Sequence, residues 1–373
     1  MKRRTFLERA GYVGFGALAS RGSASASTGP VRVGVVTEPG GAHLDLFVRA
    51  LGACEGVDTV ALCDPSGASF ERSKKSLAAR SATARTFADY REMLREHRPE
   101  IVVMTLEPVH TPPVIEAALE AGAHVLAEKP PCVRQADFER LVALAKAKKR
   151  HLMLAFATRV TSPARKAREL VEQGYLGKLY GVSMTWIADQ TRLRNPAYHK
   201  TWTAQKARAG GGQLIFHGVH YIDLIQYIAG STVTRVSGFV RNVGGQPIDV
   251  EDAAVVALEL GNGMVGTLNT GYYLDKNYDN RITVWGSEGW LRFGFTSESL
   301  PLEWYSTHAG APKGVQTFSY SDEPDGYYIL TREAVAAARG LAQAPMTGTE
   351  CLAVMKTVFA AYRAAGTGVT QKV

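Results

Sequence analysis

The fold is decided near the start of the chain by residues 31–42, which read Val31-Arg32-Val33-Gly34-Val35-Val36-Thr37-Glu38-Pro39-Gly40-Gly41-Ala42. The first six residues form a β-branched run that is typical of a buried parallel strand. A glycine turn follows, and residues 43–52 continue with the apolar spacing of a helix. A second strand is predicted at 57–63, and it ends at Asp64. Strand, glycine turn, helix, strand and terminal acid are the layout of a dinucleotide-binding βαβ unit.

The glycine turn departs from the usual G-x-G-x-x-G fingerprint of such units. Thr37, Pro39 and Ala42 occupy the three glycine positions, whereas Gly40 and Gly41 fall between them. Pro39 has no N–H to offer a phosphate, so a pyrophosphate would depend on neighbouring amides and on the helix N-terminus. We therefore predict cofactor contacts at Thr37, Gly40 and Gly41.

Asp64 indicates which dinucleotide is bound. A carboxylate at the end of the second strand can accept hydrogen bonds from both ribose hydroxyls of NAD and repels the 2′-phosphate of NADP. The sequence therefore predicts NAD, with NADP less favoured. The other interpretation of Asp64 is a loop acid that caps the following segment.

Strands and helices continue to alternate after this unit, which favours a parallel sheet with helices on its faces. We predict a helix near 87–96, a strand at 101–105, a helix at 113–121 and a strand at 124–127. The last strand leads into Glu128-Lys129-Pro130-Pro131, where Pro130 forbids its continuation.

Two segments of this half resemble a known family. They are Thr105-Leu106-Glu107-Pro108-Val109-His110 and Ala121-Gly122-Ala123-His124-Val125-Leu126-Ala127-Glu128-Lys129-Pro130. Together they resemble the Gfo/Idh/MocA superfamily of glucose-fructose oxidoreductase and inositol dehydrogenase, and the likeness extends from about residue 31 to the C-terminus. The resemblance implies NAD or NADP in a Rossmann domain and a sugar, a polyol or a derivative as substrate.

The resemblance also implies roles for single residues. Thr105, His110 and Glu128 are expected to contact the cofactor, with Glu128 near the nicotinamide ribose. Lys129 is expected between the nicotinamide and the substrate, where it touches both and is catalytic. An ammonium group there can hydrogen-bond the reacting hydroxyl and stabilise its alkoxide.

The pattern changes from residue 151 onward. We predict a helix at 163–173, strands at 179–188, 233–243, 253–260, 264–273 and 281–285, and a final helix at 347–365. Turn dipeptides such as Gly244-Gly245 and Asn262-Gly263 separate the strands, which favours an open, mainly antiparallel sheet. The resemblance implies the same arrangement, with a free sheet face that serves for homo-oligomerisation.

A chain of 373 residues with 46% hydrophobic residues exceeds what one core usually supports. The predicted fold class is α/β, with residues 29–150 as a Rossmann dinucleotide-binding domain. Residues 151–373 form an α+β domain for substrate binding and oligomerisation, and residues 1–28 form an export signal.

A segment of the second half has the composition of a carbohydrate site. Aromatic rings stack on the C–H face of a sugar, and charged groups bind its hydroxyls. The alternative is a solvated, partly apolar loop. We predict substrate contacts at Arg159, Trp186, Asp189, Arg192, Tyr198, His199 and Trp202.

The glycine-rich stretch at 210–224 carries two histidines. Dehydrogenases of the resembled family have an aspartate one helical turn before the conserved histidine, and here Phe216 stands in that place while His220 is kept. The loss removes one stabiliser of an imidazolium. We predict His220 as the acid/base or substrate ligand, against a satisfied core histidine. We also place His217 among the catalytic residues, with a structural role equally open.

The N-terminal residues resemble a twin-arginine export signal. Lys2-Arg3-Arg4-Thr5-Phe6-Leu7-Glu8 precedes a modest apolar run and the small residues 23–26. We therefore expect a periplasmic or otherwise exported protein that meets the twin-arginine export machinery, and a tightly bound cofactor because that route carries folded proteins. The alternative is a cytosolic protein with a basic arm.

The net charge and the cysteine spacing indicate whether a nucleic-acid partner or a metal site is expected. The net charge of +8 lies partly in the first 28 residues and is otherwise scattered without a basic block, so no nucleic-acid partner is expected. The four cysteines, Cys54, Cys63, Cys132 and Cys351, have no paired spacing, which predicts free buried thiols and no metal site.

Three functions are consistent with this sequence. The first is an NAD(P)-dependent oxidoreductase that acts on a sugar, a sugar derivative or a glycoside, with Lys129 and His220 in a proton relay. The second is an NAD-dependent enzyme that cleaves glycosides by transient oxidation at C3 and elimination. The third is a non-catalytic binding protein on the same fold.

Overall fold

The computed structural model describes residues 29–295, 301–320 and 324–373. The predicted export signal at 1–28 lies outside the described residues. In the described part of the chain, no helix combines the length and the apolar character needed to cross a membrane. All four cysteines are buried and free, which confirms the prediction of free buried thiols.

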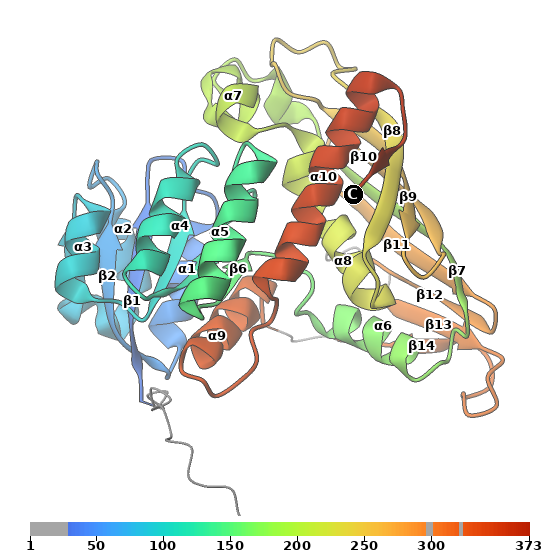
Figure 1. The fold of residues 1–373 in the computed structure, drawn as a ribbon, viewed down its shortest axis with the longest axis horizontal. Helices are drawn as coiled ribbons and strands as arrows, with labels where there is room; N and C mark the ends of the chain where they lie inside the picture. Colours follow the sequence, from blue (N-terminus) through green and yellow to red (C-terminus); the bar gives the residue numbers. More distant parts are fainter. Residues whose placement is uncertain (1–28, 296–300, 321–323) are drawn as a thin grey trace, which may run out of the picture.

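The N-terminal half is a parallel sheet with helices on both faces (Figure 1). The buried β-branched runs pair along the sheet in the order β3-β2-β1-β4-β5-β6, with β1 at its centre. The strands are β1 (Val31–Thr37), β2 (Val57–Cys63), β3 (Arg85–Phe87), β4 (Ile101–Thr105), β5 (His124–Ala127) and β6 (Leu152–Leu154). The carboxyl ends of β1, β2, β4 and β5 therefore meet at one edge of this sheet.

The first-half helices follow the predicted alternation. They are α1 (Leu44–Ala53), α2 (Phe70–Ser76), α3 (Tyr90–His97), α4 (Thr111–Glu120) and α5 (Gln135–Lys148). The helix predicted from residue 87 begins later, because the Asp89 side chain accepts hydrogen bonds from the N–H groups of Arg91 and Glu92 and so caps α3. The residues just before that cap form the edge strand β3 instead.

The C-terminal half is built on a large, mainly antiparallel sheet of order β14-β13-β12-β11-β7-β10-β9-β8-β15. Only β7 and β10 pair in parallel among its described strands. Its strands are β7 (Leu179–Asp189), β8 (Val233–Arg241), β9 (Ala253–Leu260), β10 (Val265–Leu274), β11 (Asp279–Gly286), β12 (Gly289–Phe293), β13 (Leu302–Ser306), β14 (Gln316–Phe318) and β15 (Gln371–Lys372). The predicted fold class is confirmed.

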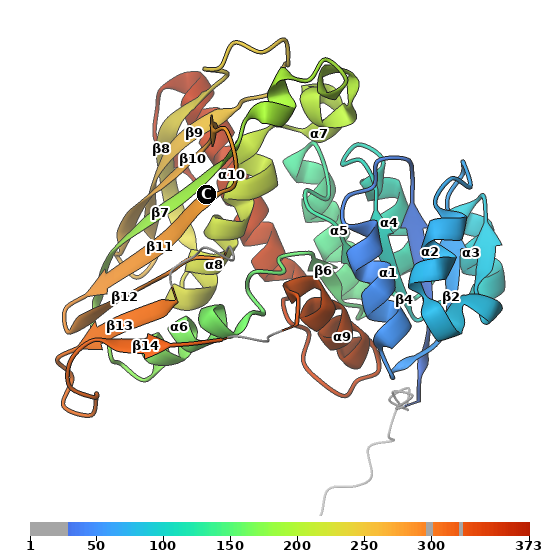
Figure 2. The same cartoon turned by 180° about the vertical axis from the view of Figure 1, so that it is seen from behind.

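Three helices lie on one face of this sheet: α6 (Ser162–Glu172), α8 (Val219–Ala229) and α10 (Gly348–Thr367). Figure 1 shows α10 between the two sheets. The first sheet continues past residue 150 into β6, and α9 (Gly326–Ala338) returns from the second half to lie beside α1 (Figure 2). The two halves are thus joined by chain segments that cross between them.

The other face of the large sheet exposes apolar side chains. Phe239 is 70% exposed, and Tyr180, Val255, Val265 and Trp285 are also exposed on the same group of strands and their ends.

Candidate active site

Lys129 follows β5 at the edge where the carboxyl ends of the parallel strands meet. Its Nζ donates a hydrogen bond to the carbonyl oxygen of Phe216 at 2.9 Å. Burial lowers the pKa of Lys129 below its ordinary value, Glu128 opposes this effect, and the charge of Arg192 adds to it. Lys129 therefore gives up a proton more readily than a surface lysine does.

The glycine-rich stretch reaches this edge through a close backbone contact. A Cβ on Gly212 would overlap the carbonyl oxygen of Glu251, so glycine is required there. The buried Glu251 carboxylate accepts hydrogen bonds from the N–H groups of Gly212 at 2.7 Å and Leu214 at 3.0 Å. It thereby satisfies backbone donors at the start of the following helix.

That helix begins with a π-helical turn at Leu214–Gly218, which continues directly into α8. The His217 ring stacks on Trp186 with centroids 5.3 Å apart, and the His220 ring stacks on the same indole at 5.7 Å. Both predicted histidines therefore pack against the indole ring of Trp186.

Both imidazoles are neutral near pH 7. Burial is the main cause that lowers the pKa of His217 and of His220 well below the ordinary value, and the charge of Lys129 lowers both further. The structure therefore brings Lys129, His217 and His220 together as one ammonium group beside two neutral bases.

Phe216 stands where the resemblance implies an aspartate, and its side chain packs on Trp202. Its ring meets Trp202 edge-on, with centroids 5.8 Å apart. Its backbone oxygen, rather than a carboxylate, accepts the hydrogen bond from Lys129. Trp202 also lies against Gly40 in the glycine turn, so this aromatic pair reaches from the predicted cofactor turn to the histidines.

Arg192 and Tyr198 reach the histidine cluster through Tyr272. The Arg192 guanidinium donates to the Tyr272 hydroxyl and lies over the rings of Tyr272 and Tyr198, at 4.5 and 5.9 Å from the centroids. The Tyr272 hydroxyl is in turn 3.5 Å from Nδ1 of His217.

Asp189 and His199 have mainly local contacts. The Asp189 carboxylate accepts from the N–H of Thr191 at 2.7 Å, and Nε2 of His199 lies 2.6 Å from the carbonyl oxygen of Leu193. These contacts stabilise the loop after β7, and substrate contact by either residue stays a prediction.

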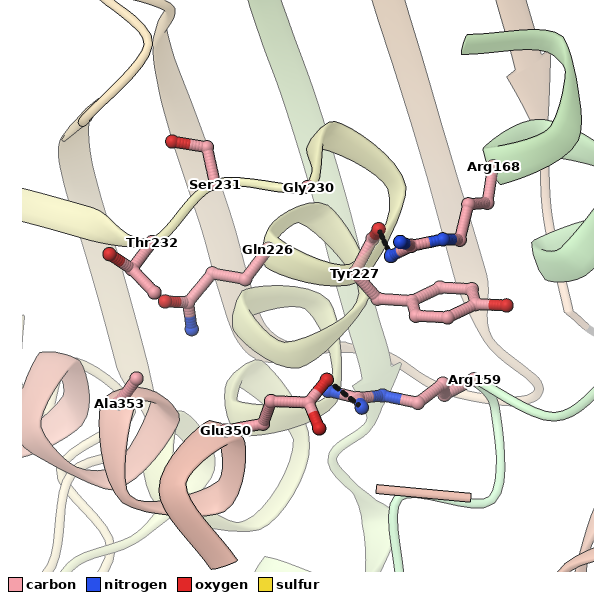
Figure 3. A pocket seen from close by; sticks show the side chains of 9 residues that line it. All are labelled: Arg159, Arg168, Gln226, Tyr227, Gly230, Ser231, Thr232, Glu350 and Ala353. Atoms are coloured by element: carbon pink, nitrogen blue, oxygen red, sulfur yellow. Dashed lines mark hydrogen bonds and ion pairs between the residues drawn. The ribbon is translucent and has the colours of Figure 1, made fainter. Parts of the chain in front are cut away.

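Arg159 lies in a buried ion pair. Its side chain is 3% exposed, its Nε donates to Asp223 at 3.1 Å, and its Nη1 donates to Glu350 at 2.8 Å. Figure 3 shows it at one wall of a cavity of about 490 Å³ between α6, α8 and α10. The guanidinium therefore has two carboxylate partners within the chain, which gives it a packing role, and its predicted substrate contact is untested.

The predicted cofactor turn is closely packed against β4. The hydroxyls of Thr37 and Thr105 share a hydrogen bond of 2.8 Å, and a Cβ on Gly41 would overlap the carbonyl oxygen of Thr105. Gly40 has a φ of +85°. The turn thus presents its backbone at the crevice where α/β sheets bind dinucleotides.

Asp64 carries a negative charge at the end of β2. Burial alone would raise its pKa, but hydrogen bonds from Ser66 and Ser69 lower it below the ordinary value. These are loop-capping contacts, at 2.9 Å to each N–H. The capping interpretation is therefore confirmed, and recognition of a ribose by the same carboxylate is compatible with it.

His110 is exposed and lies beside Glu38. Its Nδ1 is 2.9 Å from a carboxylate oxygen of Glu38, whose other oxygen accepts from the N–H of Glu107. Glu107 also pairs with Arg208. Glu38, Glu107 and His110 offer ligand atoms within 4.8 Å of one another, but in the described chain each already has a partner.

The structure adds residues that the sequence did not indicate. Nδ1 of His43 lies 2.9 Å from Glu128 and 2.9 Å from the Tyr327 hydroxyl, so α9 contributes to the cofactor edge. Gln213, one turn earlier in the chain, and Tyr272, on β10, contact His217. His43 falls at the end of the glycine turn, where a sequence signal existed, whereas no local pattern marks Tyr327.

The residues at this edge fit a dinucleotide. In the turn at the end of β1, Gly40 is exposed and Gly41 is half-buried, and the ionised Asp64 stands at the end of β2. Lys129 and the histidines lie beyond the turn, where a nicotinamide would end. Fold and site together define a two-domain protein in which a dinucleotide-binding edge of the first sheet meets a cluster of polar and aromatic side chains from the second domain.

Comparison with known proteins identifies the family. Residues 31–156 match the oxidoreductase family with an NAD-binding Rossmann fold, and residues 164–292 match the GFO/IDH/MocA C-terminal domain. The two matches cover more than half of the chain, which belongs to the Gfo/Idh/MocA family.

Three curated relatives give the range of activities. Levoglucosan dehydrogenase of Pseudarthrobacter phenanthrenivorans is 28% identical over 48% of this chain and 51% of its own length. Myo-inositol 2-dehydrogenase of Thermotoga maritima is 28% identical over 55% of this chain and 59% of its own length, and D-glucoside 3-dehydrogenase of Escherichia coli is 26% identical over 69% and 75%. The chain thus spans only about half to three quarters of these relatives.

A solved structure of levoglucosan dehydrogenase in complex with NADH and L-sorbose has the same fold. It superposes with a TM-score of 0.79 at 19% identity, over 92% of this chain and 99% of the other. The likeness in fold therefore covers both domains.

Proposed function

We propose that this protein is an NAD-dependent oxidoreductase that acts on a sugar, a sugar derivative or a glycoside. The observation that carries the proposal is the cluster of Lys129, His217 and His220 at the end of β5, where a bound nicotinamide would face the second domain. The named activities of the relatives, all on sugars or polyols, support the substrate class.

Lys129 and His220 have different roles in proton transfer under this proposal. Lys129 donates a hydrogen bond to the reacting hydroxyl and stabilises the alkoxide that forms, and its lowered pKa suits proton relay. His220 is neutral and accepts the proton or orients the substrate. NAD, when bound, supplies the acceptor for the hydride from the substrate carbon.

A second reaction is favoured by one specific observation. Two neutral imidazoles lie in this site, and Phe216 leaves no carboxylate between them and Lys129. After transient oxidation at sugar C3, a second base can remove the acidified C2 proton, and elimination then expels the glycosidic group. Addition of water and return of the hydride from the NADH formed to the C3 ketone would complete glycoside cleavage without net oxidation. The name of the Escherichia coli relative, D-glucoside 3-dehydrogenase, places oxidation of that protein's substrate at position 3.

Two measurements test the function. Denaturation of the purified protein should release nicotinamide dinucleotide, or NAD should bind on titration. Lys129→Met should lower kcat by about 100-fold or more, because one donor to the developing alkoxide is lost. Lys178→Met, a change at an exposed lysine, is the matched control and should leave kcat unchanged.

Absence of any bound or titratable dinucleotide would instead favour the non-catalytic binding protein. To separate the two reactions, the holoenzyme is incubated with aryl glycosides in deuterated water. Deuterium at sugar C2 without net NADH indicates elimination, and a stoichiometric ketone indicates plain oxidation.

We further propose that the protein is exported by the twin-arginine route to the periplasm with NAD already bound, and that NAD is preferred to NADP. The ionised Asp64 supports the preference. The exposed apolar face of the large sheet, including Phe239 and Val265, supports assembly of a homo-oligomer through that face.

A further inference from the structure

Gln213 is a fully buried polar residue one turn before His217. Its side chain has three partners. Oε1 lies 2.7 Å from Nδ1 of His217, and Nε2 lies 3.0 Å from Oγ1 of Thr270 and 3.4 Å from the carbonyl oxygen of Trp186.

The Trp186 carbonyl fixes which way the amide of Gln213 points. A carbonyl oxygen only accepts hydrogen bonds, so the amide group that faces it must be the NH₂. The amide oxygen consequently faces His217. The flipped amide would place two oxygens against each other in a buried site, which is unfavourable.

This orientation fixes the tautomer of His217. The Gln213 oxygen only accepts, so Nδ1 of His217 must carry the hydrogen of the 2.7 Å bond. Burial and the charge of Lys129 keep the ring neutral, as its lowered pKa indicates. A neutral imidazole with its hydrogen on Nδ1 has its lone pair on Nε2.

His217 and His220 differ in this respect. Nδ1 of His220 is buried and has no hydrogen-bond partner among the described residues, so no side chain of the described ranges sets its tautomer. Of the two rings that stack on Trp186, only His217 therefore has its tautomer set by a hydrogen bond at Nδ1.

We propose that Gln213 is a positioning residue that holds His217 with Nε2 unprotonated, so that His217 accepts the proton of the substrate hydroxyl and His220 is the residue that orients the substrate. In the step, the substrate O–H bond breaks, its proton forms a bond to Nε2, and the electron pair stays on oxygen as an alkoxide. Nδ1 keeps its hydrogen on Gln213, and the imidazolium returns the proton from Nε2 on reversal. This inference rests on the proposed function for its substrate, but the tautomer does not depend on it.

The tautomer is measured directly by long-range ¹H–¹⁵N NMR of the protein labelled with ¹⁵N-histidine, with His217→Asn to assign the signals. At pH 7.5 we expect neutral His217 with hydrogen on Nδ1, in the presence or absence of NAD. Hydrogen on Nε2, or a charged ring, would overturn the proposal whether or not the protein proves to be an oxidoreductase.

Variants of Gln213 test the consequence for catalysis. Gln213→Leu should mix the two tautomers in the NMR spectrum and lower kcat by about 10- to 100-fold with little change in KM. Gln213→Glu should restore part of kcat and move the acid limb of the pH profile to higher pH, because a carboxylate stabilises the imidazolium.

The matched control is Gln173→Leu, since this exposed glutamine also makes a side-chain hydrogen bond, to Glu169 at the end of α6. In this variant, the NMR signals that report the His217 tautomer, and kcat, should match those of the unmodified protein. An unshifted acid limb in a folded Gln213→Glu variant would remove His217 as the proton acceptor.

Discussion

Arg159→Met tests whether the buried ion pair between α8 and α10 is a packing element or part of the substrate site. The Arg159 and Asp223 side chains are 3% and 0% exposed, and Glu350 is 45% exposed. Methionine keeps the unbranched stem of arginine but removes the guanidinium. Asp223 then lies buried without its cationic partner. Burial already raises its pKa to about 6, so it must keep an unpaired charge or take up a proton, whereas the charge of Glu350 remains hydrated.

The loss in the free energy of unfolding should be large because the Asp223 carboxyl group loses its partner and stays in the interior. Removal of one member of a buried pair typically costs about 3–5 kcal/mol, whereas replacement of both members by apolar residues is often close to neutral. We therefore expect Arg159→Met to lower the free energy of unfolding by about 3–5 kcal/mol. Addition of Asp223→Leu should recover most of that loss.

Urea unfolding followed by circular dichroism measures both values. The matched control is Arg165→Met, whose ion pair with Glu333 has side chains 47% and 25% exposed, and which should cost less than about 1 kcal/mol. A cost for Arg159→Met no greater than for this control would refute the reasoning from burial. Loss of turnover in a stable double variant would assign Arg159 to the substrate, as its sequence context suggested.

Four further predictions follow from the described contacts. Asp64→Ala should raise the affinity for NADP relative to NAD by about tenfold or more in fluorescence titrations, and an unchanged ratio would contradict recognition by Asp64. Stability in urea should fall as the pH drops from 7.5 to 5.5, because burial holds the pKa of both site histidines below that of the unfolded chain, which then binds more protons; a flat profile would exclude buried neutral rings. Gly212→Ala should destabilise by more than about 2 kcal/mol through overlap with the Glu251 carbonyl, whereas Gly366→Ala in α10, with open space around it, should be neutral or more stable by up to about 1 kcal/mol. Phe239→Lys on the exposed sheet face should shift the light-scattering mass toward the monomer, and an unchanged mass would place the oligomer contact elsewhere.

Strands β1, β2, β4 and β5 were predictable because each is short, largely buried and bounded by strong turn residues, whereas the exposed edge strand β3 was missed. The predicted start of α3 was too early, because the Asp89 side chain caps the helix at that point. In the second half, runs of β-forming residues between turn dipeptides predicted β7 to β11, whereas β12 to β15 were missed. Nothing local indicates that β7 and β10 pair in parallel.

The site was only partly predictable, because its contacts join segments far apart in sequence. The position of Lys129 follows from the strand that carries it. The contact between Tyr327 and His43 depends on how α9 returns to the first domain, and the bond between Gln213 and His217 depends on a π-helical turn that no residue pattern marks. The first contact is set by tertiary packing between segments far apart in the chain, whereas the second is local and depends on the backbone geometry of that turn.

Phe216 stands where the resemblance implies an aspartate, so the site has no carboxylate at that position. Lys129 and Arg192 both lower the pKa of His217, and the group that receives the Lys129 hydrogen bond is a neutral carbonyl of Phe216. Such a site favours an oxyanion over a cation, because positive groups face it without a carboxylate at that position. Plain oxidation and elimination both pass through an oxyanion, an alkoxide in the first and an enolate in the second, so this electrostatic preference serves either reaction. What separates them is whether a second base is available for a carbon-bound proton. With His217 held in its base-competent tautomer by Gln213, the neutral His220 beside it is the group that elimination would require in addition.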